Sequence, residues 1–301
     1  MAYARTTVAM VAVLVATVTG CSAGGASDPG PVGPTPPSPS PSATAALTSA
    51  ERSLLYDAEQ TLVQQCMRRH GFSLAKVPER PVPEHRDFPY GLDDAGWAGR
   101  HGYGSDLQRR AVKLRASDPN RRYARSLDAG RRAEAMDALH GRTPNALSVK
   151  LPTGRQVSRS DEGCTARAED ELYGDLAAWF RAEAITQALS ITRQTKVVAD
   201  PAYARAVDRW SACMRGRGLA YPDPAAARAR FLDGSSGTSW AEERRTALAE
   251  TKCAASSGLT GTAARLSRRY GDALRAEHAE VFRERDRLAR GALPRARVIT
   301  D

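Results

Sequence analysis

Between residues 48 and 290, apolar residues recur mainly at intervals of three and four, which is the spacing of one face of an α-helix. The first such stretch begins at Thr48, which forms a capping-box pattern with Glu51, and it ends near Gly71, a residue suited to a left-handed C-terminal cap. Its apolar positions are Leu55, Ala58, Leu62 and Cys66. The pattern predicts a first helix over residues 48–71.

Further stretches have the same spacing and are bounded by residues that start or end helices, such as Asp-Pro and Gly. They lie at 118–127, 131–140, 160–185, 200–218, 239–258 and 262–290. We expect the stretch from residue 160 to be one long helix that bends near Gly174. The last stretch carries a narrow apolar stripe flanked by charges. We expect it to pack on its own domain, and a coiled-coil arm is the alternative.

Residues 148–159 have the only strand pattern in the chain that we regard as significant, with a turn at Pro152-Thr153-Gly154. The sequence therefore predicts a mostly α fold, an irregular helical domain with one small β-hairpin.

The first 21 residues have the pattern of a bacterial lipoprotein signal peptide. Arg5 supplies a positive charge, residues 6–19 form an apolar run, and Gly20-Cys21 follows. Val18-Thr19-Gly20-Cys21 resembles a lipobox, so we expect Cys21 to be acylated and the protein to stay on the outer face of the cytoplasmic membrane, because two acyl chains hold a protein there stably. Ordinary secretion with cleavage after Ala23 is the alternative.

Residues 22–47 are rich in Pro and Ser and show no apolar periodicity, so we expect a disordered tether. A Pro-rich chain extends by about 3.1 Å per residue. The tether would therefore act as a spacer between the membrane and the folded part.

Two heptapeptides are similar: Cys66-Met67-Arg68-Arg69-His70-Gly71-Phe72 and Cys213-Met214-Arg215-Gly216-Arg217-Gly218-Leu219. Each is followed by one more cysteine, Cys164 or Cys253. We expect two helix-pair units, residues 48–195 with a long loop and the hairpin and residues 196–301 with a long C-terminal helix. Export places these cysteines in an oxidising compartment, and stapling within each unit predicts the disulfides Cys66–Cys164 and Cys213–Cys253. Crossed pairing and free thiols are the alternatives.

The chain has 301 residues, of which 42% are hydrophobic and 26% charged, as in soluble globular proteins. Its 44 basic and 34 acidic residues give a formal net charge of +10. This balance suggests an anionic cell-wall polymer or another envelope component as partner, although a GC-rich genome that favours arginine would produce the same charge. We expect no nucleic-acid partner, because no helix-turn-helix or aromatic RNA-binding signature is present.

No serine-hydrolase, metalloprotease or Cys-x-x-Cys motif occurs in the sequence, and the five histidines are scattered. We therefore assign no catalytic residue, no metal and no cofactor. The function that the sequence favours is a lipid-anchored, non-enzymatic binding or structural module for a partner protein or an anionic wall component. The alternative is a cell-wall hydrolase with a site in residues 84–103.

Residues 84–103 are a candidate binding loop, because they combine charged, imidazole and aromatic side chains between Gly and Pro residues. The candidate residues are His85, Asp87, Tyr90, Asp93, Asp94, Trp97, His101 and Tyr103. Three interpretations remain open: a long loop held by its aromatic residues, a binding surface, and a Zn²⁺ or Ca²⁺ site.

The chain resembles a group of uncharacterised lipoproteins of Streptomyces and related actinobacteria. The resemblance rests on residues 210–215 (Trp-Ser-Ala-Cys-Met-Arg), 221–224 (Tyr-Pro-Asp-Pro) and Cys253 with Gly258-Leu259, and on the aromatic and glycine residues of 88–91 and 102–104. It implies a location and an architecture and no activity.

Overall fold

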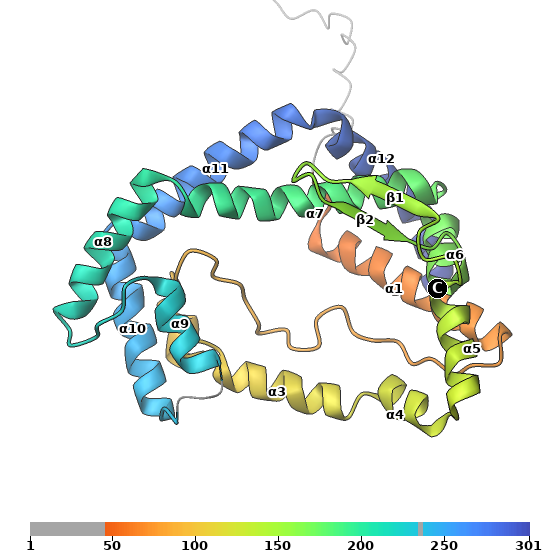
Figure 1. Cartoon of the computed structure of the whole chain (residues 1–301), viewed down its shortest axis with the longest axis horizontal. Helices are drawn as coiled ribbons and strands as arrows, with labels where there is room; N and C mark the ends of the chain where they lie inside the picture. The colour runs from red at the N-terminus through yellow and green to blue at the C-terminus, as the bar shows by residue number, and fades with distance from the viewer. Residues whose placement is uncertain (1–45, 234–236) are drawn as a thin grey trace, which may run out of the picture. The chain divides into compact units, whose positions relative to one another are not determined.

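The computed structural model describes residues 46–233 and 237–301, and this part of the chain is mostly α-helical (Figure 1). The predicted signal peptide, Cys21 and the part of the predicted tether up to residue 45 lie outside the described residues. The helices are α1 (Ser49–Arg69), α2 (Ala95–His101), α3 (Ser105–Ala116), α4 (Pro119–Ser126), α5 (Ala129–His140), α6 (Gly163–Tyr173), α7 (Leu176–Val198), α8 (Pro201–Arg215), α9 (Pro224–Leu232), α10 (Trp240–Ser256), α11 (Leu259–Glu277) and α12 (Ala279–Thr300).

Several helices begin at the capping residues that the sequence indicates. Thr48 and Glu51 form the predicted capping box on α1. Asp118 and Asp200 accept backbone N–H groups at the starts of α4 and α8, each with Pro at the first helical position. Ser239 caps α10 by accepting the N–H of Glu242. Local side-chain chemistry therefore sets these helix starts.

The predicted hairpin is confirmed. Strands β1 (Leu147–Lys150) and β2 (Gln156–Arg159) pair antiparallel, with Val149 opposite Val157. The turn uses Gly154 at φ 84°, a left-handed conformation that glycine adopts without strain.

Two of the predicted long helices are interrupted. The stretch from residue 160 begins later, at Gly163, and Gly174 ends α6 at φ 81° instead of bending it, after which Asp175 caps α7. The C-terminal stretch breaks at His278 and continues to Thr300. No Gly or Pro marks this second break. It separates α11, which packs on α7 and α8, from α12, which packs on α1, α6 and α7, so tertiary contacts explain it.

Helices α2, α3 and α9 lie in segments for which the sequence predicted no helix. They are short, and α2 lies inside the candidate loop, where Asp94 caps it by accepting the N–H of Trp97. Short helices depend on tertiary packing, which is why their periodicity is weak in the sequence.

Two large hydrophobic clusters form the core. One joins buried residues of segment 82–107 to residues of α8, α9, α10 and α11. The other joins α1, α6 and the start of α7 to α12. Residues 48–195 and residues 196–301 thus both contribute to each cluster. A small third cluster lies between α7, α11 and α12 and includes Leu189 and Leu274.

The predicted disulfides are both present. Cys66 of α1 bonds Cys164 of α6, and Cys213 of α8 bonds Cys253 of α10. Each disulfide therefore joins the helix that carries one copy of the repeated heptapeptide to a helix later in the chain.

The repeated heptapeptide is a repeated helix ending. In the first copy the N–H of Phe72 donates to the carbonyl of Met67, and the N–H of Gly71 donates to that of Arg68. In the second copy Leu219 and Gly218 donate in the same way to Met214 and Arg215. This pair of bonds is the Schellman motif, in which a left-handed glycine ends the helix and an apolar residue follows.

Candidate binding pocket

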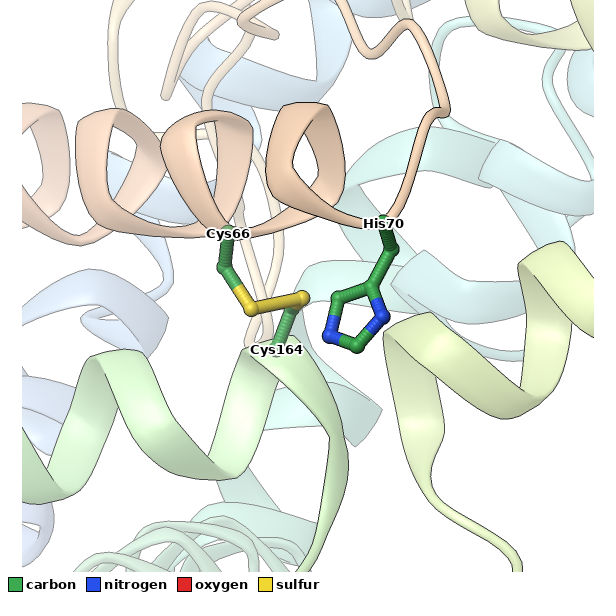
Figure 2. A group of neighbouring side chains, drawn as sticks. All are labelled: Cys66, His70 and Cys164. Atoms are coloured by element: carbon green, nitrogen blue, oxygen red, sulfur yellow. A yellow bond between two sulfur atoms is a disulfide. The ribbon is translucent and has the colours of Figure 1, made fainter.

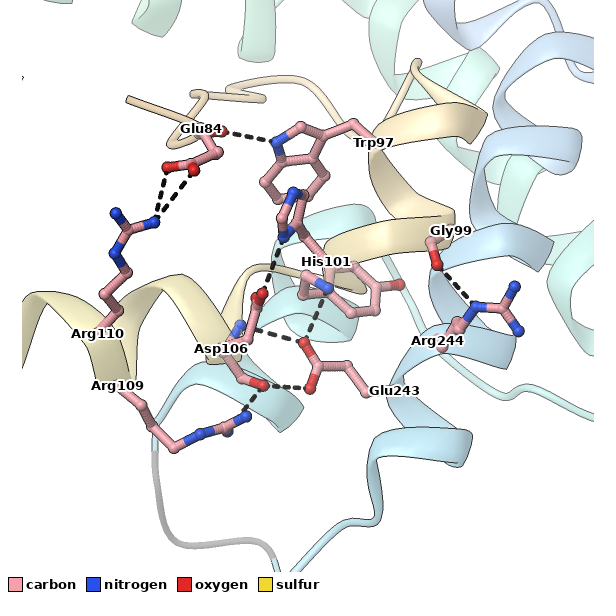
Figure 3. Close-up of polar contacts among 11 residues, drawn as sticks. Glu84, Trp97, Gly99, His101, Asp106, Arg109, Arg110, Glu243 and Arg244 are labelled. Carbon is pink, nitrogen blue, oxygen red and sulfur yellow. Dashed lines mark hydrogen bonds and ion pairs between the residues drawn. The ribbon is translucent and has the colours of Figure 1, made fainter. Parts of the chain in front are cut away.

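Aromatic packing fixes the part of the candidate loop around Trp97. Trp97 is buried, and its indole N–H donates to the carbonyl of Glu84 at 2.9 Å (Figure 3). Its ring lies 4.8 Å from that of Phe88. Asp94 caps α2 and pairs with Arg86, and the pKa of Asp94 is lowered by the hydrogen bonds from Trp97 and Arg86.

The loop's candidate histidines and its carboxylates do not form a cluster. His101 contacts Asp106 at 2.8 Å between Nδ1 and Oδ2 (Figure 3). The exposed side chains of His85, Asp87 and Asp93 make no hydrogen bond or ion pair with the described residues. The described residues of this loop therefore provide no cluster of ligands for the Zn²⁺ or Ca²⁺ site that was one interpretation of the sequence.

In the described part of the chain, one group of possible metal ligands lies close enough together to hold an ion: Cys66, His70 and Cys164. The two sulfur atoms are bonded to each other beside the His70 ring (Figure 2). Because zinc binds cysteine as thiolate, this oxidised pair offers it no ligand.

A pocket of about 460 Å³ lies where the loop meets α8, α9 and α10. Its walls are predominantly aromatic and apolar, and they include Phe88, Tyr90, Tyr103 and Tyr203. Three ionisable side chains also line it: Asp223, Arg228 and Glu250. Of the eight candidate loop residues, Tyr90 and Tyr103 line this pocket.

Glu250 fixes one end of the loop segment to α10. Its side chain accepts the backbone N–H of Leu92 at 2.8 Å and the hydroxyl of Tyr103 at 2.5 Å. Burial raises the pKa of Glu250 to about 7, although these hydrogen bonds and the charge of Arg228 lower it. Gly91 is required here because it has φ 115° and a Cβ would lie 3.2 Å from Glu250 and Pro224.

Glu243, two turns earlier on α10, fixes the other end of the segment (Figure 3). It accepts the backbone N–H of Tyr103 at 2.9 Å and that of Ser105 at 3.2 Å, together with the Ser105 hydroxyl. A Cβ on Gly102 would lie 2.8 Å from the Glu243 side chain, so the approach requires glycine. Two buried glutamates of one helix thus position the loop.

Two polar groups of the pocket have no partner in the described residues. The Tyr90 hydroxyl is buried without a hydrogen bond. The Arg228 side chain forms no hydrogen bond or ion pair, although its charge acts on Glu250. By contrast, the Tyr203 hydroxyl donates to the Tyr90 carbonyl at 3.2 Å. Buried polar groups usually have partners, so the Tyr90 hydroxyl marks a place for a ligand acceptor, and the half-buried Arg228 side chain offers further donors beside it.

The sequence analysis did not select Tyr203, Asp223, Arg228, Glu243 or Glu250. One feature of the sequence could have indicated Glu243 and Glu250. They are seven residues apart and therefore share one face of α10, and that face is buried, where acidic residues are unusual.

No known protein family matches this sequence, and neither a curated protein nor a solved structure shows significant similarity to the chain. Within residues 46–233 and 237–301, no helix combines the length and the apolar composition needed to cross a bilayer.

Proposed function

We propose that this chain is a lipid-anchored protein on the outer face of the cytoplasmic membrane and that its folded part is a binding module. The sequence Val18-Thr19-Gly20-Cys21 and the Pro-rich stretch after it support the anchor. The observation that carries the binding role is the buried, unpartnered Tyr90 hydroxyl, with Arg228 beside it, in a mainly apolar pocket. Ligand sites commonly combine apolar walls with a few polar groups that orient the ligand.

The pocket lining defines the class of ligand. Aromatic rings pack best on flat apolar groups, and a volume of about 460 Å³ suits a small molecule. Arg228 and Tyr90 offer donors to an acceptor oxygen, whereas Asp223 and Glu250 add negative charge to the same lining. A ligand with a ring-bearing apolar body and a neutral acceptor group therefore fits better than a strong anion. This pocket does not account for the anionic partner that the basic composition suggests.

Two naphthalene dyes test this site, because 1-N-phenylnaphthylamine is neutral and its sulfonated analogue 8-anilino-1-naphthalenesulfonate is anionic. Ala225 is exposed at the pocket, and Ala229 is exposed one turn further along α9 and outside it, so Ala225→Trp obstructs the pocket and Ala229→Trp is its matched control.

Fluorescence titration should show the neutral dye bound more tightly than the anionic one by the wild-type chain. Ala225→Trp should weaken binding of the neutral dye by at least about tenfold, equal to 1.4 kcal/mol, while Ala229→Trp binds as the wild type does. Equal binding by the two tryptophan variants would contradict the proposal.

A hydrolase is the second candidate, and one observation favours it: Asp223 and Glu250 line the same pocket, and a pKa of about 7 suits a general acid. Against it, Glu250 is 1% exposed and its two oxygens hold Leu92 and Tyr103. Incubation with purified cell-wall material separates the two functions. Turnover by the wild type that is abolished in Asp223→Asn and Glu250→Gln would establish the hydrolase, and absence of turnover supports the binding module.

A further inference from the structure

A second cavity, of about 270 Å³, lies between α7 and α11, beside the small third cluster. Its lining includes Arg193 of α7, Arg268 and Arg275 of α11, and one carboxylate, Asp272. Three cations and one anion give this lining a formal charge of +2. Helices α7 and α11 lie side by side (Figure 1), so the cationic side chains come from two facing elements.

Arg193 is the central observation. Its Nε atom is buried and has no hydrogen-bond partner, and the guanidinium group makes no ion pair with the described residues. A buried donor without an acceptor is costly, by about 1–3 kcal/mol. The structure therefore holds a charged donor at this cavity that the chain itself does not satisfy.

Gly271 lies against that side chain. It lies within α11 and lines the cavity, and a Cβ at this position would be 3.4 Å from Cδ of Arg193. Glycine inside a helix costs about 1 kcal/mol relative to alanine. The open space beside Arg193 is thus present despite a local cost to the helix.

Other groups around the cavity suit an anion with several oxygen atoms. The hydroxyls of Ser190 and Ser267 line it and have no hydrogen-bond partner in the described residues. The Arg275 guanidinium lies 4.5 Å from the centre of the Phe282 ring, which orients it. Arg285 of α12 is already paired, with Glu183 at 2.6 Å.

We propose that this cavity binds a phosphate group. Guanidinium groups bind phosphate oxygens through paired N–H donors, and serine hydroxyls add further donors. The same chemistry is offered by free phosphate, by a phosphodiester of a wall polymer and by a phospholipid headgroup. The proposal is independent of the aromatic pocket, because it uses different residues and the opposite ligand charge.

The first test uses inorganic phosphate and the full chain. Arg193→Gln removes the central charge, and Lys196→Gln is the matched control, because Lys196 is exposed on the same helix one turn away and does not line the cavity. Isothermal titration calorimetry at constant ionic strength should show phosphate binding that Arg193→Gln weakens by at least about tenfold and Lys196→Gln leaves unchanged. Absence of phosphate binding by the wild type, or equal weakening by both variants, would overturn the proposal.

A second variant separates binding from folding. Gly271→Leu fills the cavity while favouring the helix, so it should retain the wild-type helical circular dichroism and lose phosphate binding. A folded Gly271→Leu protein that binds phosphate normally would also contradict the site.

Two further probes identify the source of the phosphate. Soluble poly(glycerol phosphate) represents a wall polymer, and phosphatidylglycerol vesicles, compared with phosphatidylcholine vesicles, represent a headgroup. The probe whose affinity falls in Arg193→Gln represents the source of the phosphate. If the substitution weakens binding of inorganic phosphate only, the ligand is the free ion. Binding of both probes that is equally strong in Arg193→Gln would place polymer and lipid binding elsewhere on the chain.

Discussion

Two pairs of helices are each joined by a disulfide, α1 with α6 and α8 with α10. Helices α1 and α8 end in the same motif, but the acidic side chains of the two regions have different hydrogen-bond partners. In the pair α1 and α6, Glu169 forms an ion pair with Arg159 at 2.5 Å, and Glu183 of the adjoining α7 pairs with Arg285 at 2.6 Å. In the pair α8 and α10, Glu243 and Glu250 accept only N–H and hydroxyl groups, which come from the distant segment 92–105.

The difference explains why the pocket belongs to the second pair. Arginine partners offset the charges of Glu169 and Glu183 beside an apolar core closed by α12, although burial raises the pKa of Glu59 in α1 to about 7. Neutral donors cannot cancel a carboxylate charge, so the acids of the second pair hold a loop against α10 and leave the charge of Glu250 dependent on pH. The same heptapeptide repeat thus occurs beside an apolar core at α1 and beside a pocket with a titratable glutamate at α8.

Removal of the disulfides should have the largest effect on the free energy of unfolding. The chain-entropy model gives about 5 kcal/mol for the Cys66–Cys164 loop of 98 residues and about 4 kcal/mol for the Cys213–Cys253 loop of 40 residues. Urea unfolding of the Cys66→Ala/Cys164→Ala and Cys213→Ala/Cys253→Ala double variants measures both. A larger loss from the second pair would contradict the ranking.

Glu250→Gln should change the pH dependence of stability. The pKa of Glu250 is raised to about 7 in the folded state, so the folded chain retains a proton that the unfolded chain releases above about pH 4.5. This contribution is fully present at low pH and is lost as pH rises through about 7, by about 3 kcal/mol.

Chemical unfolding of wild type and Glu250→Gln between about pH 4.5 and pH 8 tests this directly. The wild-type free energy of unfolding should fall relative to that of the variant over this range. Burial also raises the pKa of Glu59 to about 7, but Glu59 is present in both proteins and largely cancels in the difference. Parallel curves would show that Glu250 does not titrate as described.

Tyr103→Phe should cost about 2 kcal/mol at about pH 8, where Glu250 is mostly ionised, because the Tyr103 hydroxyl then donates to a buried carboxylate. Tyr203→Phe is the matched comparison and should cost about 1 kcal/mol, since that hydroxyl donates to a neutral carbonyl. Unfolding free energies at this pH measure both costs, and an equal cost for the two variants would mean that Glu250 does not become charged in the folded chain.

The smallest effects concern the shared helix ending. Gly71 and Gly218 have φ values of 78° and 76°, so alanine at either position should destabilise the chain by about 1 kcal/mol. Gly261 lies within α11, does not have a positive φ and has open space around it, so Gly261→Ala should be neutral or stabilising. Clearly unequal costs at Gly71 and Gly218 would indicate that the two endings are not equivalent.

The sequence predicted those features that depend on neighbouring residues. Thr48 with Glu51, Asp-Pro at 118 and 200, and the two Cys-Met-Arg heptapeptides carry local signals, and the helix starts and both disulfides followed from them. The break at His278 was not predictable in this way, because it depends on which neighbours α11 and α12 pack against.

The site was only half predictable. Tyr90 and Tyr103 lie in a segment whose composition suggested binding, and both line the pocket. Their partner Glu250 follows Tyr103 by 147 positions, and no local pattern records such a contact. The charged residues of the same segment, such as His85 and Asp93, were grouped by their proximity in sequence, and the structure separates them.

Native mass spectrometry of the full chain isolated from its native cells tests the central claim, that the aromatic pocket is a ligand site, most directly. The account predicts a small molecule that remains bound to the wild type and to Ala229→Trp and is absent from Ala225→Trp. Equal retention by Ala225→Trp, or no bound small molecule in the wild type, would contradict it.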